Sequence, residues 1–387
     1  MYHKIRIGIL IENFLRDSGG AENYGLRLAA CLKDKYEVKI YCKQGDRLPA
    51  QVFRQYNVSP IEIYEYRFAS SKLKIVRAIE RRNRQKILNH IIPVECDVFI
   101  NCTSNRFVGY KDKIKSIHII HFPENSYLDY WFIPKIISRK LDARYANSYD
   151  IFLANSYFTQ YWIKQKWGLE ADILNPPISM TPIAISAIKN KKNIIIMVGR
   201  LIANKKIIEA VTIFNEKIAK YYTEWQLIII GNKDSDSEEY YSQLKNIEME
   251  SNQIVILEDA PFEILLDYYK KASIFWHAAG YNVPASKPHM MEHFGMTTVE
   301  AMSQGCVPVV IDKAGQKEIV VHNENGFRWN TLEELASYTK ELIQNSEKRF
   351  DMSLAAINGA KKFLAPEFEV KAKKIISNLL EEQYGKG

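Results

Sequence analysis

Two glutamates, Glu292 and Glu300, bracket the start of a short predicted helix in the last third of the chain. Residues 297–304 read as this helix, Gly305 as its stop, and the apolar, β-branched stretch 307–311 as a buried strand. The first N–H groups of a helix have no partner within it and lie at the positive end of its dipole. Here they belong to Gly295, Met296, Thr297 and Thr298. Amides for phosphate and carboxylates for hydroxyl groups suit a ligand shaped like a nucleotide-sugar.

Two basic residues, Arg200 and Lys205, follow an apolar strand predicted at 193–198. An arginine can hold phosphate oxygens with two N–H groups, whereas a lysine acts as a compact point charge. A solvated basic loop is the simpler interpretation. If this pair lies beside the amides before Glu300, it can stabilise a departing diphosphate without a metal ion.

A glycine pair, Gly19 and Gly20, separates an apolar strand at 4–11 from a helix that runs to about Leu32. The loop of such a strand–helix unit lies at the carboxyl edge of a parallel sheet, where these sheets bind ligands. Adjacent glycines let the backbone approach a substrate closely, although a plain connecting loop would look the same.

A histidine, His121, ends the strand predicted at 116–121 and is followed closely by Pro123. This position is again at the ligand-binding edge of a parallel sheet. His118 is on the opposite face of the strand because side chains alternate, and we expect it to pack within the protein.

Strand and helix signals alternate through both halves, which predicts an α/β protein with two doubly wound, Rossmann-like parallel sheets. A chain of 387 residues is too long for one core. Residues 175–178 stop regular structure, and a mixed segment with a proline follows. We therefore place the first domain at 1–179 and the second at 180–365.

The stretch from Glu292 to Glu300 matches the pattern E-x-F-G-x-x-x-x-E and so resembles the signature of the retaining GT-B glycosyltransferases of family 4 (glycosyl transferases group 1). Segments 305–310 and 315–320 continue the likeness. Gly19-Gly20-Ala21-Glu22 resembles the family's G-G-x-E element, and Gly199, Arg200 and Lys205 its G-R-x5-K element. The resemblance covers almost the whole chain. It implies a GT-B fold whose two domains face each other across a cleft, with the last helix, 366–387, packed back on the first domain.

The resemblance also assigns roles to residues. It implies that Glu300 accepts hydrogen bonds from ribose hydroxyls and that Glu292 contacts the transferred sugar or stabilises positive charge at its anomeric carbon. His121 is implied to reach the sugar from the other domain. Retention is expected by front-side attack, in which the donor phosphate takes the acceptor proton. The expected catalytic group is Glu292, His121, Arg200 and Lys205, and the expected nucleotide-sugar site is Gly19, Gly20, Gly199, Arg200, Lys205, Phe294, Gly295, Met296, Thr297, Thr298 and Glu300.

Two further segments, 277–292 and 121–123, resemble the mannosyltransferases that act on dolichol-linked glycans and those of bacterial surface polysaccharides. The donor implied is GDP-mannose, and the acceptor a glycan or lipid-linked oligosaccharide. Bacterial relatives use other sugars, so the donor base, the sugar and the linkage stay open. No cofactor and no metal are expected.

The charge is unevenly placed, because residues 1–180 carry 28 basic against 18 acidic side chains whereas the remainder has a net charge of −2. A basic half points to an anionic partner such as a membrane surface, lipid phosphate or nucleic acid. The stretch 72–90 reads as a basic helix that lies either on an anionic bilayer or simply in solvent. The apolar stretch 131–137 fits an acceptor-site wall, a second membrane contact or, most commonly, the core.

Other patterns in the sequence are typical of different functions. Asp234-Ser235-Asp236 has the form of a metal-binding D-x-D motif, but it stands in a polar loop rich in turn residues. A GT-B nucleotide-sugar epimerase or hydrolase is the main alternative, and a pyridoxal-phosphate phosphorylase fits less well. A nucleic-acid-binding protein would need exposed aromatic residues among its basic ones, which the sequence lacks.

The expected location is the cytoplasm, either free or held peripherally on the inner face of the membrane. No run of eighteen apolar residues is present, and the first residues do not have the pattern of a signal peptide. Five scattered cysteines without C-x-x-C spacing are typical of buried thiols in a reducing compartment.

Overall fold

The computed structural model describes residues 4–11, 20–43, 61–66, 74–104, 106–123, 135–233 and 237–384. The chain divides into two compact units. The first unit comprises residues 1–177 and 365–387, and the second comprises residues 178–364. The boundary therefore lies two residues before the predicted one, and the C-terminal helix belongs to the first unit.

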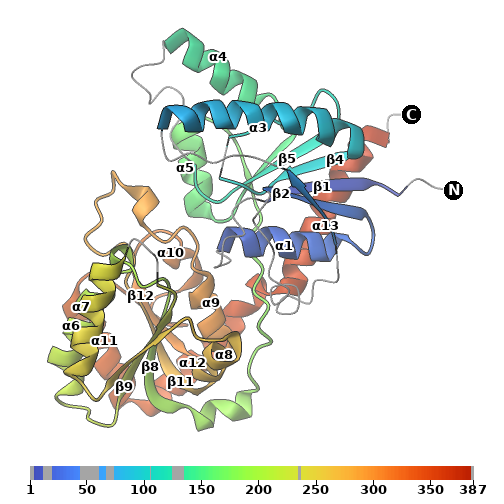
Figure 1. The fold of residues 1–387 in the computed structure, drawn as a ribbon. Helices are drawn as coiled ribbons and strands as arrows, with labels where there is room; N and C mark the ends of the chain where they lie inside the picture. The colour runs from blue at the N-terminus through green and yellow to red at the C-terminus, as the bar shows by residue number, and fades with distance from the viewer. Residues whose placement is uncertain are drawn as a thin grey trace. The chain divides into compact units, whose positions relative to one another are not determined.

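The first unit is built on a seven-stranded parallel sheet with the order β3-β2-β1-β4-β5-β6-β7 (Figure 1). Its strands are β1 (Arg6–Leu10), β2 (Glu37–Lys43), β3 (Glu62–Tyr66), β4 (Val98–Asn101), β5 (Lys115–Ile120), β6 (Ile151–Ala154) and β7 (Asp172–Ile173). The order reverses between β1 and β4, and such switch points are where open α/β sheets bind ligands.

Helices cover both faces of this sheet. On one face α1 (Gly20–Leu32) and α13 (Ala365–Tyr384) share a core with the strands, including Tyr24, Leu28 and Phe368. On the other face lie α3 (Lys74–Glu95), α4 (Lys135–Ala146) and α5 (Tyr157–Trp167), which contribute residues such as Leu88, Tyr145 and Ile163. The doubly wound form predicted for this half is confirmed.

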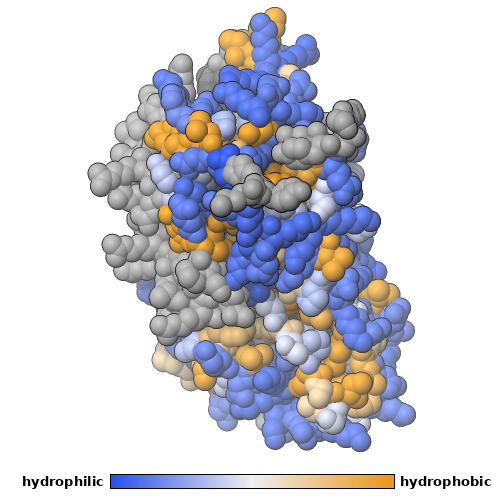
Figure 2. All heavy atoms as spheres, turned by 90° about the vertical axis from the view of Figure 1, so that its right-hand side faces the viewer, coloured by the Kyte–Doolittle hydropathy of each residue, from blue (hydrophilic) through white to orange (hydrophobic). Residues whose placement is uncertain are grey.

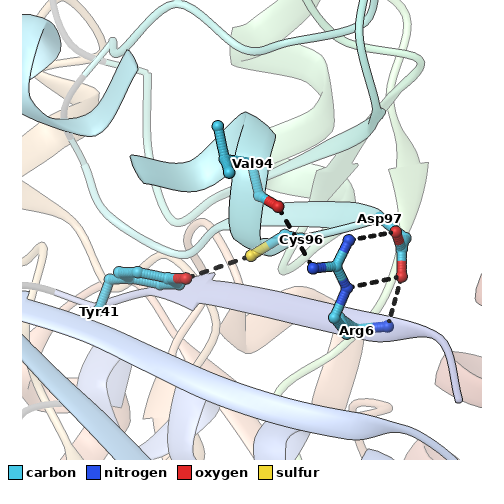
Figure 3. Close-up of polar contacts among 5 residues, drawn as sticks. All are labelled: Arg6, Tyr41, Val94, Cys96 and Asp97. Carbon is cyan, nitrogen blue, oxygen red and sulfur yellow. Dashed lines mark hydrogen bonds and ion pairs between the residues drawn. The ribbon is translucent and has the colours of Figure 1, made fainter. Parts of the chain in front are cut away.

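The amino edge of the same sheet is fixed by Arg6 and Asp97 (Figure 3). The Arg6 guanidinium donates to both carboxylate oxygens of Asp97, at 2.9 and 3.3 Å, and the Arg6 backbone N–H donates to Oδ2 at 2.9 Å. A third guanidinium nitrogen donates to the carbonyl of Val94, near the end of α3, at 3.2 Å. This pair ties β1 to the start of β4 at the edge opposite to the carboxyl ends of the strands.

The second unit has a six-stranded parallel sheet with the order β10-β9-β8-β11-β12-β13. Its strands are β8 (Lys192–Val198), β9 (Gln226–Gly231), β10 (Ile254–Glu258), β11 (Ala272–His277), β12 (Val307–Ile311) and β13 (Phe327–Trp329). Of the central pair, β11 is buried throughout and β8 is buried from Ile194 to Met197, because helices cover both faces.

One face of this sheet packs against α6 (Ile207–Phe214), α7 (Glu238–Met249) and α11 (Leu332–Gln344). The other packs against α8 (Phe262–Lys271), α9 (Met296–Ser303), α10 (Gln316–Ile319) and α12 (Ser346–Ala360). The remaining short elements are a π-helical turn, η4 (Asn215–Ala219), and 3-10 turns: η2 (Ile185–Asn190), η3 (Ala203–Lys205), η5 (Pro288–Met290) and η6 (Lys361–Phe363).

Two segments, 72–90 and 131–137, have more than one interpretation from sequence alone. The basic stretch 72–90 is helical from Lys74, and its helix continues to Glu95, with Leu88 and Ile92 buried against the sheet; Lys72 lies outside the described residues. Of the apolar stretch 131–137, the first four residues also lie outside them. Ile136 and Ile137 are 69% and 47% exposed, so core packing is wrong for these two.

The surface is mainly polar on the face drawn in Figure 2, where hydrophilic residues predominate and apolar ones form small separate patches. Within the described parts of the chain, no helix combines the length and the apolar character needed to cross a bilayer.

Candidate active site

Three side chains of the second unit meet at one carboxylate oxygen. Oε2 of Glu292 lies 2.6 Å from Nζ of Lys205 and 3.2 Å from Nε2 of His277. Lys205 ends the turn η3 that follows β8, and His277 is the last residue of β11. Because β8 and β11 are parallel neighbours, their carboxyl ends meet at one edge of the sheet, and Glu292 reaches this edge from the loop before α9.

The carboxylate of Glu292 is ionised in this setting. Burial alone would raise its pKa, but the Lys205 ammonium and the hydrogen bond from His277 outweigh burial and hold the pKa well below the ordinary range. His277 behaves oppositely, because burial lowers its pKa more than Glu292 raises it. The site therefore combines one ammonium, one carboxylate and one neutral imidazole.

Close packing explains why positions 199 and 231, which lie near Lys205, are glycines. The methylenes of the Lys205 side chain lie 3.7 Å from where a Cβ of Gly199 would be, so they run directly over that residue. The end of β9 presses on the same loop, because a Cβ on Gly231 would lie 1.8 Å from the carbonyl oxygen of Gly199. Only glycine fits at position 231.

The two basic neighbours of this loop differ. Arg200 is exposed directly after Gly199. Lys206 instead makes an ion pair with Glu209 of α6, at 2.8 Å, and has left-handed backbone angles. The predicted phosphate-binding pair, Arg200 and Lys205, thus lies on the loop at the carboxyl end of β8, with Lys205 turned toward Glu292.

The start of α9 is shaped by Gly295, which has a φ of 117° that favours glycine. The N–H groups of Gly295, Met296 and Thr297 have no acceptor among the described residues. The N–H of Thr298 differs from the prediction, because it donates to the Gly295 carbonyl at 3.1 Å and closes a turn. Three of the four predicted amides therefore stay available to an anion.

Two residues of the predicted nucleotide-sugar site, Phe294 and Thr298, have side chains that point into the core. Phe294 is buried and packs edge-on against Phe363 at 5.3 Å. The hydroxyl of buried Thr298 donates to Oε1 of Gln316 at 2.9 Å. Neither side chain is therefore turned toward a ligand, which a pattern of residue types does not reveal.

Glu300 is half-buried one turn inside α9. Its Oε2 accepts a hydrogen bond from the hydroxyl of buried Tyr269 at 3.2 Å. Burial first, and then this carboxylate, raises the pKa of Tyr269 well above its usual value, so the phenol stays a donor. Tyr269 positions Glu300 from α8, and nothing in its local sequence indicated this role.

His277 and Gln316 were also missed as site residues. His277 appeared only within a segment of family likeness, and its position at the end of a buried strand, the same signal that singled out His121, could have identified it. Gln316 is fully buried, and its Nε2 lies 2.5 Å from where a Cβ of Gly295 would be. Its contact with α9 depends on a loop packing that residue spacing does not reveal.

In the first unit, the structure brings His121 next to α1. The rings of His121 and Tyr24 meet edge-on with centroids 5.4 Å apart, one turn from Gly20 at the start of that helix; Gly19 lies outside the described residues. Burial lowers the pKa of His121 to about 4, so the ring is neutral. Its Nε2 donates to the Cys102 carbonyl at 3.2 Å, which leaves Nδ1 as an acceptor. His118 is buried as predicted.

The parts of the chain that the structure describes hold no group of three or more His, Cys, Asp or Glu side chains suited to a metal ion. The segment Asp234–Asp236 lies outside those parts.

Comparison with known proteins agrees with the two parallel-sheet units described above. The profile of the family "Glycosyl transferases group 1" matches residues 181–359, and that of "Glycosyltransferase Family 4" matches residues 18–176. A solved structure of Anabaena HepE in complex with UDP and glucose covers 97% of this chain and all of its own, with a TM-score of 0.73 and 16% identity. A glycosyltransferase from Rickettsia africae covers 98% of this chain and all of its own, with a TM-score of 0.71 and 16% identity. These likenesses confirm the predicted GT-B fold.

Among curated proteins, the chain is similar to the GDP-Man:Man(3)GlcNAc(2)-PP-Dol alpha-1,2-mannosyltransferases. The Dictyostelium discoideum protein is 31% identical over 166 residues, which are 41% of this chain and 30% of that protein. The human protein is 26% identical over 240 residues, or 57% of this chain and 47% of that protein. The matches thus span less than half the length of these relatives.

Proposed function

Because the chain belongs to family 4 of the glycosyltransferases, we propose that it moves a hexose from a nucleotide-diphosphate sugar to a glycan or lipid-linked acceptor, with retention and without a metal ion. The observation that carries this proposal is the meeting of Lys205 and Glu292 at the carboxyl edge of the second sheet, 2.6 Å apart.

The departing diphosphate gains negative charge as the glycosidic bond breaks, and the site holds groups that can stabilise it. The three available amides at the start of α9 and the basic side chains of Arg200 and Lys205 supply fixed dipoles and charge. When the diphosphate binds, the Lys205 ammonium can turn from Glu292 to a phosphate oxygen, because its four-carbon chain is flexible.

The carboxylates take the ends of the donor. Glu300, held by Tyr269, accepts from the ribose hydroxyls, and Glu292 contacts the transferred sugar or stabilises charge at its anomeric carbon. In the first unit, Nδ1 of His121 can accept a hydroxyl group, since its Nε2 is engaged by the Cys102 carbonyl. We assign no nucleophile to the protein; the donor phosphate takes the acceptor proton in a front-side reaction.

GDP-mannose is the donor that we favour, and the support is the name shared by the curated relatives, which are GDP-Man-dependent mannosyltransferases acting on PP-Dol-linked glycans. A carrier-linked glycan is accordingly the acceptor that we favour, in the biosynthesis of a cell-surface polysaccharide.

A carrier lipid would hold its glycan at a membrane surface, and α4 supports a peripheral contact. The C-terminal end of this helix packs on the sheet through Tyr145, whereas its first turn extends away from the sheet (Figure 1). It exposes Ile136 and Ile137 beside Lys135, Arg139 and Lys140, so apolar and cationic side chains lie together. We propose that it rests on the anionic inner face of a membrane, with the protein on the cytoplasmic side.

A thermal-shift panel of GDP, UDP, dTDP, ADP and CMP in EDTA tests the donor assignment, because a ligand that binds only the folded state raises Tm. We expect GDP to give the largest shift. Mass spectrometry then follows mannose transfer from GDP-mannose to a carrier-linked glycan. An acceptor-independent epimer or free sugar would instead identify an epimerase or a hydrolase.

A further inference from the structure

We propose that His277 is a positioning residue for the reaction, which donates a hydrogen bond to Oε2 of Glu292 and so aims Oε1 at the bound sugar. This inference rests on the proposed function and deepens it, since it names the group that fixes the carboxylate.

The two carboxylate oxygens of Glu292 have different surroundings. Both hydrogen bonds of its carboxylate within the described parts of the chain, from Lys205 and from His277, go to Oε2. Its side chain is 23% exposed, whereas that of His277 is only 5% exposed. One oxygen is thus held from within the protein, and the other is left for a ligand.

The sheet fixes the backbone position from which the His277 side chain extends. His277 ends β11, a strand paired with β8 on one side and with β12 on the other, where His277 is opposite Val310. The preceding residue, Trp276, anchors the strand on its other face, because its indole N–H donates to Oγ1 of Thr339 at 2.9 Å. A short, buried side chain on such a strand has little freedom to move.

The hydrogen-bonding pattern also sets the protonation state of His277. Its Nδ1 is buried without a partner among the described residues. A proton on Nδ1 would leave a buried N–H donor unsatisfied, which is destabilising. The proton therefore belongs on Nε2, where it points to Glu292, and the ring is neutral.

Lys205 and His277 have different roles toward Glu292 when the donor binds. Lys205 supplies the charge that keeps Glu292 ionised, but its ammonium is mobile and the diphosphate competes for it. The imidazole of His277 is neutral and fixed, so a phosphate does not draw it away. His277 then holds Glu292 in place during the step in which Glu292 faces the sugar.

A ligand-free measurement tests the contact itself. In ¹⁵N–¹H spectra of the full-length protein, we expect His277 as the Nε2–H tautomer at pH 7, with an Nε2–H signal that shifts in Glu292→Gln. A protonated Nδ1 at pH 7, or a His277 signal that is insensitive to Glu292→Gln, would overturn the proposal. This result does not depend on the identity of the donor.

Kinetics with GDP-mannose tests the role. His277→Leu keeps the volume but removes the donor, and we expect kcat to fall about 10–100-fold, as for loss of a hydrogen bond to a charged group. The affinity for GDP, which lacks the sugar, should change less than about 2-fold. His277→Gln, which places an amide N–H near the position of Nε2, should restore most of the rate.

The double variant His277→Leu, Glu292→Gln should be no slower than Glu292→Gln alone, because His277 acts only through Glu292. Wild-type kcat in His277→Leu, or a loss of GDP affinity that parallels the loss of rate in both His277 variants, would refute the positioning role. Failure of the wild-type protein to use any nucleotide-sugar would instead contradict the proposed function and leave the spectra to decide on His277.

Discussion

Lys205 and Glu292 are 87 residues apart in the sequence, yet the ammonium of one lies 2.6 Å from the carboxylate of the other. Two loops at the carboxyl edge of one parallel sheet bring them together. The pair keeps a carboxylate ionised beside amides and cations that suit a diphosphate, and this combination is what the proposed chemistry requires.

Removing the ammonium should change how the rate depends on pH. The Lys205 ammonium and the His277 hydrogen bond hold the pKa of Glu292 well below its ordinary range, so we expect no loss of activity through Glu292 between pH 5 and 8. In Lys205→Met, burial is opposed only by the hydrogen bond from His277, and the pKa of Glu292 rises. The acid limb of the kcat profile should therefore move to higher pH. An acid limb at the same position in both proteins would show that Lys205 does not set this ionisation.

The loop that carries Arg200 and Lys205 should not tolerate a side chain at position 231. A Cβ there would lie 1.8 Å from the carbonyl of Gly199, and we expect Gly231→Ala to destabilise the protein by about 3 kcal/mol or more. Gly168→Ala is the matched control. Gly168 has a φ of 68° but open space around it, so its cost should be only about 1 kcal/mol. Urea unfolding of both variants measures the difference, and equal losses would contradict this account of Gly231.

Lowering the pH should reduce the stability of the first unit, because His118 is buried there as a neutral ring. Burial lowers the pKa of this residue to about 3, whereas an unfolded histidine titrates near 6.5. The unfolded state therefore binds the extra proton below pH 6.5, and the stability that is fully present above this pH falls as pH decreases, by roughly 1 kcal/mol per pH unit.

In the variant His118→Gln this slope between pH 6.5 and 4.5 should be shallower, whatever its stability at pH 7. Calorimetric unfolding of both proteins across this range provides the test. Parallel slopes would mean that His118 does not titrate differently in the two states.

The ion pair between Arg6 and Asp97, at the amino edge of the first sheet, should contribute to stability and not to activity. Asp97→Asn removes the charge that Arg6 faces, at the amino edge of the first unit (Figure 3). Because both side chains are about one-quarter to one-third exposed, we expect a modest loss of about 1 kcal/mol. The kcat of the variant should equal that of the wild type. A large loss of kcat with unchanged stability would contradict the separation of the two edges.

Most strands could be predicted from the sequence because buried parallel strands are continuous apolar, β-branched runs. The run that became β12 was predicted at its observed bounds, and β8 within one residue. The strands β7 and β13 were missed, because a two-residue and a three-residue strand carry no periodic signal.

The site was predictable only in part. The sequence pattern identified Lys205, Glu292 and the amides of α9, because these groups lie at fixed spacings within two short motifs. The inward turn of Phe294, and the support of Glu292 by His277 and of Glu300 by Tyr269, arise from packing between segments far apart in the chain. Residue types in one segment do not encode such contacts.

The most direct test of the central claim is the rate of mannose transfer from GDP-mannose in EDTA, compared between the wild-type protein and Glu292→Gln. We predict metal-free turnover by the wild type, a fall of about 100-fold or more in the variant, and similar GDP affinity in both. Wild-type turnover by Glu292→Gln would contradict the account.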